Sequence, residues 1–218
     1  MKRRGVGIFV LGLVLLALPL AAAAQDQGWE IRLRGISINP NDSSDTIAGL
    51  GSDVAVDSAI VPEVDFVYRF QKHFGFELVL ATARHDLKAS GGILPGYNLG
   101  SVRLLPPTFT FQYYFTPSEK IEPYVGIGVN WTRFYSYNLP DGLASLGVKS
   151  LDFSNSFDVA AQVGMDVKFN SHWLFNVDVK YVRIDTDVGI RLVTGGTLDT
   201  VNVKVDPWIF GVGVGYRF

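Results

Sequence analysis

Eight segments of the chain alternate large apolar residues with small or charged residues at a period of two, and this pattern most restricts the possible fold. Period-2 alternation predicts β-strands whose two faces differ in polarity. The segments cover residues 29–36, 63–70, 74–81, 108–115, 124–131, 157–169, 175–181 and 208–218. In the last of them, Trp208, Phe210 and Phe218 share one face, whereas the glycines between them and Arg217 share the other. The sequence therefore predicts an all-β protein of eight strands.

The N-terminus indicates the compartment. Met1 to Arg4 is basic, residues 5–20 are almost entirely apolar, and Ala22 to Ala24 offers an A-x-A cleavage site. This combination predicts a secretory signal peptide over residues 1–24, removed by cleavage. The alternative is a membrane-anchor helix, but the apolar run is short for a span of roughly 20 residues. Residues 25–218 then form a single domain.

Composition narrows the fold further. The formal net charge of −2 gives no electrostatic reason to expect a nucleic-acid partner, and the absence of cysteine excludes disulfides. Beyond residue 24, no apolar run is long enough for a transmembrane helix. If the chain resides in a membrane, its strands must close into a barrel, which leaves no backbone group unpaired in lipid. An even number of strands agrees with bacterial outer-membrane barrels.

The two faces predict which side meets lipid. Opposite the aromatic face the strands carry a nearly balanced set of acids and bases. An eight-stranded barrel has little room inside, so the bulky aromatic face fits the outside better than the inside. The alternative is an inverted soluble barrel of the lipocalin kind, with the aromatic face as its core.

The connections between the strands differ in length. Residues 71–73, 116–121 and 170–172 form short turns, whereas residues 37–60, 85–100, 137–155 and 187–200 form long connections rich in Gly, Asp, Ser and Asn. Short periplasmic turns and long extracellular loops are typical of outer-membrane barrels. The sequence thus predicts an eight-stranded antiparallel transmembrane barrel in the bacterial outer membrane.

We find no sign of catalysis, metal binding or a cofactor. His73 and His172 lie in short turns, and His85 has no serine at a useful spacing. The glycines at 126 and 211 keep a strand period and open no helix, so they do not predict a nucleotide site. Asp185 and Asp187 are interpreted as solvated loop residues. We expect no enzyme activity.

Strand direction lets each inward residue be assigned a height in the lumen. The lower lumen is predicted to be a charged floor made of Glu30, Arg32, Arg69, Glu77, Asp166, Lys168, Asp178 and Arg217. The upper lumen is predicted to be an apolar ligand-binding well made of Val79, Ala81, Leu104, Pro106, Phe134, Val182, Ile184, Pro207 and Ile209. Passage through the floor would unpair buried ions, which is costly, so sideways exit into lipid is the cheaper route.

Prolines mark the upper strand regions. Pro62, Pro106, Pro107 and Pro207 cannot donate to the ladder of backbone hydrogen bonds. They are consistent with a lateral seam in the wall, and equally with strand ends above the membrane.

Three stretches resemble the outer-membrane protein W (OmpW) family of Gram-negative bacteria, and the resemblance covers essentially all of the chain after the signal. They are "LLPPTFTFQYYF" at 104–115, "PYVGIGVNWTRFY" at 123–135 and "DPWIFGVGVGYRF" at 206–218. The resemblance implies an eight-stranded barrel with a hydrophobic lumen that passes small hydrophobic compounds, with lateral escape into the membrane. It also implies recognition of the aromatic end, Tyr216 and Phe218, by the barrel-assembly machinery.

Two functions follow as hypotheses. One is an apolar channel or well for a small hydrophobic ligand, embedded in the lipid bilayer of the outer membrane. The other is a structural, adhesive or receptor barrel whose loops bind partners, since family members also serve as colicin or phage receptors. The apolar upper lumen favours the first.

Overall fold

The computed structural model describes residues 27–47, 53–92, 95–117 and 119–218. The predicted signal peptide, residues 1–24, lies outside the described residues. Over the part of the chain that the structure describes, no helix is long and apolar enough to cross a membrane.

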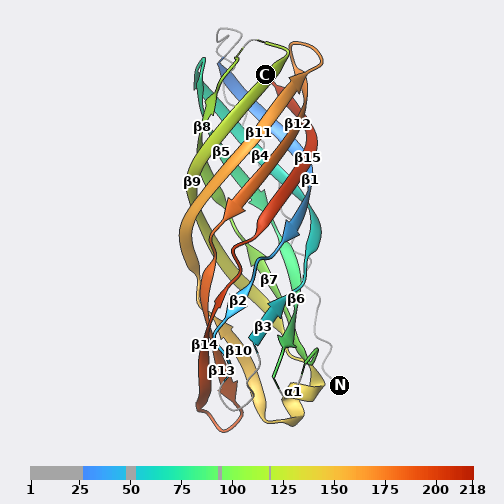
Figure 1. Cartoon of the computed structure of the whole chain (residues 1–218), viewed down its shortest axis with the longest axis vertical. Helices are drawn as coiled ribbons and strands as arrows, with labels where there is room; N and C mark the ends of the chain where they lie inside the picture. The colour runs from blue at the N-terminus through green and yellow to red at the C-terminus, as the bar shows by residue number, and fades with distance from the viewer. Residues whose placement is uncertain (1–26, 48–52, 93–94, 118) are drawn as a thin grey trace, which may run out of the picture.

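Eight strands close into a barrel in which each strand runs antiparallel to both neighbours (Figure 1). In pairing order they are β1 (Gly28–Asn39), β4 (Ala59–Gln71), β5 (Phe74–Ala81), β8 (Thr108–Tyr114), β9 (Ile121–Asn138), β11 (Ser156–Lys168), β12 (Trp173–Val182) and β15 (Trp208–Arg217). The barrel closes where β15 pairs with β1, from Glu30 opposite Arg217 to Asn39 opposite Trp208. The N–H of Phe218 continues this seam by donating to the carbonyl of Trp29 at 2.9 Å. The predicted eight-stranded antiparallel barrel is confirmed.

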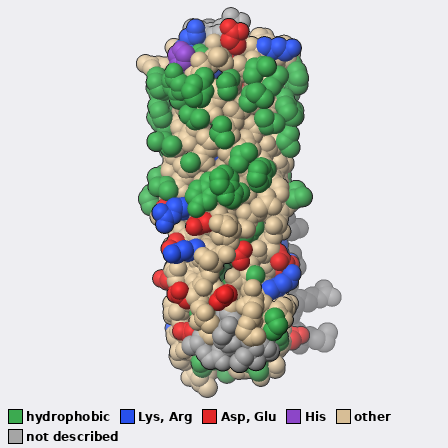
Figure 2. Space-filling view, viewed as in Figure 1, with side chains coloured by type: hydrophobic (Ala, Val, Ile, Leu, Met, Phe, Trp, Pro, Cys, Tyr) green, Lys and Arg blue, Asp and Glu red, His purple; other side chains and the backbone are tan. Residues whose placement is uncertain are grey.

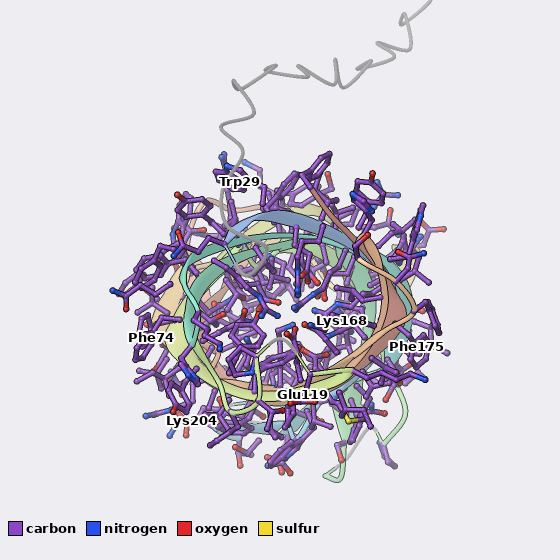
Figure 3. The ribbon with its side chains drawn as sticks, turned by 90° about the horizontal axis from the view of Figure 1, so that it is seen from above. Trp29, Phe74, Glu119, Lys168, Phe175 and Lys204 are labelled. Carbon is purple, nitrogen blue, oxygen red and sulfur yellow. The ribbon has the colours of Figure 1, made fainter. Side chains whose placement is uncertain are left out.

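The wall of this barrel is apolar outside and polar inside. Ile127 and Phe157 are each 70% exposed, whereas Arg32 and Glu77 on the inner face are fully buried. Figure 2 shows hydrophobic side chains gathered over one half of the visible face, and Figure 3 shows Trp29 and Phe74 outside the ring of strands. Side chains this apolar are stable outside only against lipid, so the inverted soluble barrel is excluded. We call this half the belt.

A second half extends the wall beyond the belt, on the side away from the short turns (Figure 1). Its elements are β2 (Ser43–Ser44), β3 (Asp53–Val56), β6 (Ala83–Ser90), β7 (Asn98–Leu105), α1 (Asp141–Ser145), β10 (Val148–Phe153), β13 (Asp185–Leu192) and β14 (Thr197–Lys204). The segments predicted as long irregular loops are therefore largely paired strands. We call this half the extension.

These strands were missed because the alternation of apolar and polar residues is reversed between the belt and the extension. Along β6, Ala83, Leu87 and Ala89 are buried while Arg84 and Lys88 are exposed. The inner face of the extension is therefore apolar and its outer face is polar, as expected for strands surrounded by water rather than lipid. The Gly-, Asp- and Ser-rich composition of these segments comes from their solvated faces and turns, and it masked the strand period.

Candidate functional site

The lower lumen is filled by buried ion pairs that the alternation of the belt strands turns inward. At its centre lies Arg32 of β1, which is fully buried. Its Nη2 is 2.8 Å from Oδ2 of Asp166, and its Nη1 is 3.2 Å from Oε1 of Glu77. Its Nε is 2.5 Å from Oε1 of Glu30 on the same strand. One guanidinium thus joins carboxylates from β1, β5 and β11 across the lumen.

A second layer lies on the extension side of Arg32. Arg34 of β1 pairs with Glu63, with Asp65 at 2.6 Å and with Asp178 at 2.7 Å. Lys180 adds a pair to Asp178 at 2.6 Å. All of these side chains are at most 2% exposed.

A third layer lies toward the short turns. Arg69 reaches Oε2 of Glu122 at 2.7 Å, and Arg217 reaches the same atom at 3.1 Å and Glu30 at 2.8 Å. Lys168, whose side chain is 18% exposed, pairs with Oε1 of Glu122 at 2.9 Å. The guanidinium carbon of Arg69 also lies 3.5 Å from the ring centroid of Tyr114, a cation–π contact. The charged floor is therefore three layers deep.

All eight residues predicted for the floor lie in these layers, and the prediction omitted several others. Those omitted are Arg34, Glu63, Asp65, Glu122, Tyr124, Asn176 and Lys180. Glu122 was missed because it stands beside Pro123 near a turn, although it keeps the inward phase of Tyr124 two residues later. Strand phase extended by one step would have found it.

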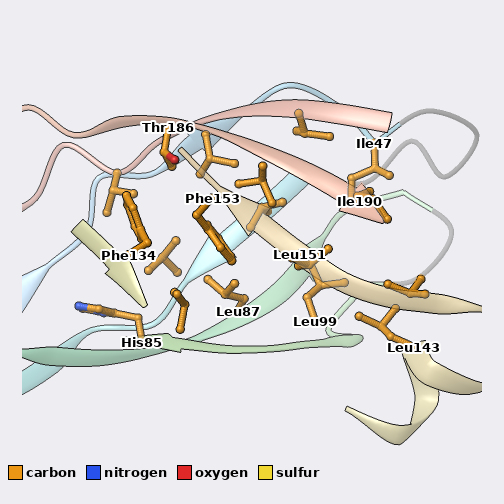
Figure 4. Close-up of a pocket in the computed structure, with 18 of the residues that line it drawn as sticks. Ile47, His85, Leu87, Leu99, Phe134, Leu143, Leu151, Phe153, Thr186 and Ile190 are labelled. Carbon is orange, nitrogen blue, oxygen red and sulfur yellow. The ribbon is translucent and has the colours of Figure 1, made fainter. Parts of the chain in front are cut away.

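Two apolar cavities lie beyond the floor. The smaller, of about 30 Å³, is a throat directly above Lys180 and Glu63. Eight of the residues predicted for the upper lumen line the throat: Val79, Ala81, Leu104, Pro106, Val182, Ile184, Pro207 and Ile209. The larger, of about 390 Å³, lies inside the extension, and Leu104 and the predicted Phe134 line it. We call it the upper cavity (Figure 4).

The upper cavity is built mostly by residues that the sequence placed in loops. Leu87, Leu151, Val188 and Val201 come from four different extension strands and meet around it. Phe153 stacks on Phe134 with ring centroids 5.5 Å apart. Thr186 and His85 are the two polar side chains among the described residues that line the cavity. Its lining can bury an apolar molecule and offers few hydrogen bonds.

His85 lines both the throat and the upper cavity and is 3% exposed. Its Nδ1 lies 2.7 Å from the carbonyl oxygen of Asp57, and because a carbonyl only accepts, Nδ1 carries the proton. Burial lowers the pKa of His85 below the ordinary value of 6.5, despite this hydrogen bond, which opposes the shift. The ring is therefore neutral at pH 7, and its Nε2 is an acceptor.

The barrel wall is interrupted beside the throat. The β5–β8 ladder ends at Val79 opposite Thr108, and the β6–β7 ladder begins at Ala83 opposite Leu104. Residues 80–82 and 105–107, between these ends, have no register partner across the gap. Pro106 and Pro107 have no N–H, and their carbonyls accept from Asn130 and Trp131 of β9 on the other side. We call this gap the wall break.

The other prolines do not interrupt the wall in this way. Pro62 lies within β4 and faces Gly35 in a continuous β1–β4 register. The carbonyl of Pro207 accepts from the N–H of Val182 at 3.2 Å. Of the two interpretations of the prolines, the gap at 106–107 fits a seam, whereas Pro62 marks neither a seam nor a strand end.

The remaining candidate positions carry ordinary interactions. Asp185 and Asp187 accept from Nδ2 of Asn202 at 2.6 and 3.1 Å. Among the residues described, no group of three His, Cys, Asp or Glu side chains could hold a metal ion. At the chain end, Tyr216 and Phe218 stack edge to face with centroids 5.1 Å apart.

Comparison with known proteins gives consistent matches. The chain matches the OmpW family over residues 28–218. It is 33% identical over 215 residues to outer membrane protein W of Vibrio cholerae, covering 96% of this chain and 98% of that one. The crystal structure of OprG from Pseudomonas aeruginosa is similar with a TM-score of 0.81 and 32% identity, over 90% of this chain and 99% of that one. A more distant relative from Pseudomonas aeruginosa, "Dibenzothiophene metabolism operon protein PahQ", is 24% identical over 172 residues, 79% of this chain and 77% of that one.

Proposed function

The chain belongs to the OmpW family of bacterial outer-membrane barrels, which are non-enzymatic, and from this premise we propose that its upper cavity takes up small hydrophobic compounds and passes them sideways into the membrane. The observation that carries the proposal is the upper cavity itself. Its volume of about 390 Å³ lies within the range of roughly 300–1,000 Å³ of small-molecule sites. Burial of an apolar ligand there is favourable at about 25 cal/mol per Å².

The floor supports a sideways rather than an axial path. A solute moving along the axis would have to separate Arg32 and Arg34 from their carboxylates. Removing one partner of a buried ion pair costs roughly 3–5 kcal/mol. The lower lumen therefore opposes passage of an apolar molecule at several consecutive layers.

The wall break supplies the lateral path. Ala81 and Pro106 face the throat on its two sides, while Leu80 and Leu105 are more than a third exposed on the outer surface. Across the gap, the Thr82 hydroxyl donates to the carbonyl of Leu104 at 3.2 Å and lies 2.6 Å from the Tyr135 hydroxyl. These side-chain contacts are easier to part than a backbone ladder.

The ligand class agrees with the name of a relative. PahQ is named for an operon of dibenzothiophene metabolism. Dibenzothiophene is a flat heteroaromatic molecule with almost no hydrogen-bonding capacity, and a cavity lined by Leu, Val, Ile and Phe side chains suits such a molecule. We take this as support for an apolar ligand and not for one compound.

The proposed partners include the assembly machinery. Tyr216 lies near the end of β15, and Phe218, which follows the strand, is 54% exposed. An exposed aromatic end is the signal that we propose the barrel-assembly machinery reads.

The alternative is a receptor or adhesive barrel that binds partners at its extracellular tip. It predicts that function depends on the surface of the extension and not on its interior. The upper cavity favours transport, because a protein that binds partners only at its tip does not require an apolar interior.

One experiment separates the two functions. Leu104→Arg and Ile184→Lys each place a charge beside the throat, whereas Val193→Arg places one on an exposed residue of the tip. Transfer of a fluorescent hydrophobic probe into lipid vesicles is measured with each variant, after gel mobility with and without heating has shown that the barrel is folded. Transport predicts that the two interior variants fall to the rate of empty vesicles and that Val193→Arg keeps the wild-type rate. Equal rates for wild-type, Leu104→Arg and empty vesicles would reject transport.

A further inference from the structure

Three arginines gather on the outer surface where the belt meets the extension. Arg84 of β6, Arg103 of β7 and Arg133 of β9 are exposed, and their neighbours in sequence are buried, or half-buried in the case of Phe134, so all three side chains point outward. They lie on adjacent strands, because β6 pairs with β7 and β7 pairs with β9. We call them the arginine cluster.

The register brings these like charges together. Arg84 is directly opposite Arg103, and directly opposed side chains have Cβ atoms about 5 Å apart. Arg103 faces Tyr135, and Arg133 is the next outward residue of β9 on the belt side, a diagonal neighbour about 7–8 Å away. Like charges placed opposite each other destabilise a sheet. An anion bound between the three arginines would offset this repulsion.

The protein itself places few negative charges beside the arginine cluster. Within the described residues, Arg103 and Arg133 have no ion-pair partner, and Arg84 has only a long contact of 3.7 Å to an exposed Asp86. By contrast, exposed Arg191 of the extension pairs closely with Asp152, at 2.8 Å.

The position of the cluster relative to the belt indicates what the anion is. On the belt side it is bordered by exposed Leu105 and Trp131, and Tyr135 lies within it. Aromatic residues of this kind mark the membrane–water interface, so the arginines stand at the height of lipid headgroups. In Figure 2 charged side chains crowd the surface directly beyond the hydrophobic belt. The cluster lies on the side opposite the short turns, which is the outer leaflet.

We infer that Arg84, Arg103 and Arg133 form a binding site for the phosphate groups of a phosphorylated glycolipid of the outer leaflet, of the lipid A type. Planar guanidinium groups bind phosphate oxygens through paired hydrogen bonds. Three guanidiniums on adjacent strands match a headgroup with two phosphates better than a single-phosphate lipid. The acyl chains of such a lipid would lie along Leu105 and Trp131. This site is separate from the upper cavity and does not depend on transport.

The test uses the full-length barrel in a zwitterionic detergent and fluorescent lipid A carrying both phosphates. Each lost arginine is expected to weaken binding about fivefold, and the triple variant Arg84→Gln, Arg103→Gln, Arg133→Gln on the order of a hundredfold. Arg191→Gln is the matched control, since Arg191 is also exposed in the extension but pairs with Asp152 at 2.8 Å, and it should leave the affinity unchanged. Arg103→Lys should keep part of the affinity, because it keeps the charge and loses the paired geometry.

Two further lipids separate phosphate recognition from other causes. Dephosphorylated lipid A should bind wild-type protein about as weakly as lipid A binds the triple variant. Phosphatidylglycerol, with one phosphate, should bind less tightly than lipid A. Equal binding of lipid A to the wild-type and triple variants would overturn the proposal, as would undiminished binding of the dephosphorylated lipid. If the triple variant does not fold, the fivefold loss in Arg103→Gln alone decides.

Discussion

At the scale of single residues, His85 lines both the throat and the upper cavity, and its imidazole ring can bind a proton. It is buried, it donates through Nδ1 to Asp57, and burial lowers the pKa of its ring below 6.5. The carboxylates of Asp57 and Asp86 oppose this shift without reversing it. A neutral imidazole is compatible with an apolar ligand beside it, whereas an imidazolium would require solvation that the cavity lacks.

The lowered pKa predicts how stability depends on pH. Above 6.5 the histidine is neutral in both the folded and the unfolded chain, so it has no effect on the pH dependence. As the pH falls below 6.5 the unfolded chain binds the proton first, and the free energy of unfolding decreases until the folded-state pKa is reached. The measurement is urea unfolding in lipid vesicles between pH 8 and pH 5. Replacing His85 with Gln should remove this part of the slope, while His172→Gln, in an exposed turn, serves as the control; identical slopes for wild-type and His85→Gln would contradict the prediction.

At the scale of elements, the wall break is the feature that distinguishes one pair of strands from the rest. The strand connections β5–β6 and β7–β8 both pass through it, and Pro106 of the β7–β8 connection lacks the N–H that could donate across it. If the gap is the exit, restoring this donor should narrow it. The variant Pro106→Ala returns the N–H group and is expected to slow release of a hydrophobic probe into lipid several-fold.

The matched control for this prediction is Pro62→Ala. Pro62 also lies in the upper part of a belt strand, but the register of β4 with β1 is continuous there. Its replacement should therefore neither widen nor narrow the wall break. Probe release should be unchanged in this variant. If Pro106→Ala released the probe as fast as wild-type while folding normally, the exit would have to lie elsewhere.

The elements also show what the sequence could predict. The belt strands were predicted because their outward residues are aromatic and their inward residues are charged or glycine, a contrast that few other environments produce. The extension strands were missed because water lies outside them. Along β13 and β14, exposed Asp187, Thr200 and Lys204 have the composition of loops, while inward Val188, Val201 and Val203 are modest in size. The upper cavity was therefore predicted only at Leu104 and Phe134, where it adjoins the throat.

At the scale of the whole molecule, the barrel combines two tubes of opposite polarity. The tube within the belt is filled by ions and excludes apolar solutes, and the tube within the extension is lined by aliphatic side chains and excludes ions. The partners of each floor residue could not be read from the sequence, because a single guanidinium can bind residues far along the chain. Arg32, for example, pairs with Glu77 and Asp166, which are 45 and 134 residues away in sequence. Strand phase predicts which residues point inward, and only the closed barrel determines which of them meet.

The sealed floor leads to a prediction about ions. Arg32, Tyr114 and Tyr124 fill the lumen at the level of the belt, and their exposed fractions are zero. An eight-stranded barrel filled in this way has no continuous water column, so the wild-type protein in a planar bilayer should show no steady ionic current while it still speeds transfer of a hydrophobic probe. The variant Arg32→Gly, Tyr124→Gly removes two of these three side chains and should admit a small current. Val193→Gly, on the exposed tip, is the control and should conduct no more than wild-type. A steady current through the wild-type barrel that rises with salt concentration would mean that the axial path is open, and the argument for sideways release would lose its physical basis, because apolar solutes would then have a continuous lumen to follow.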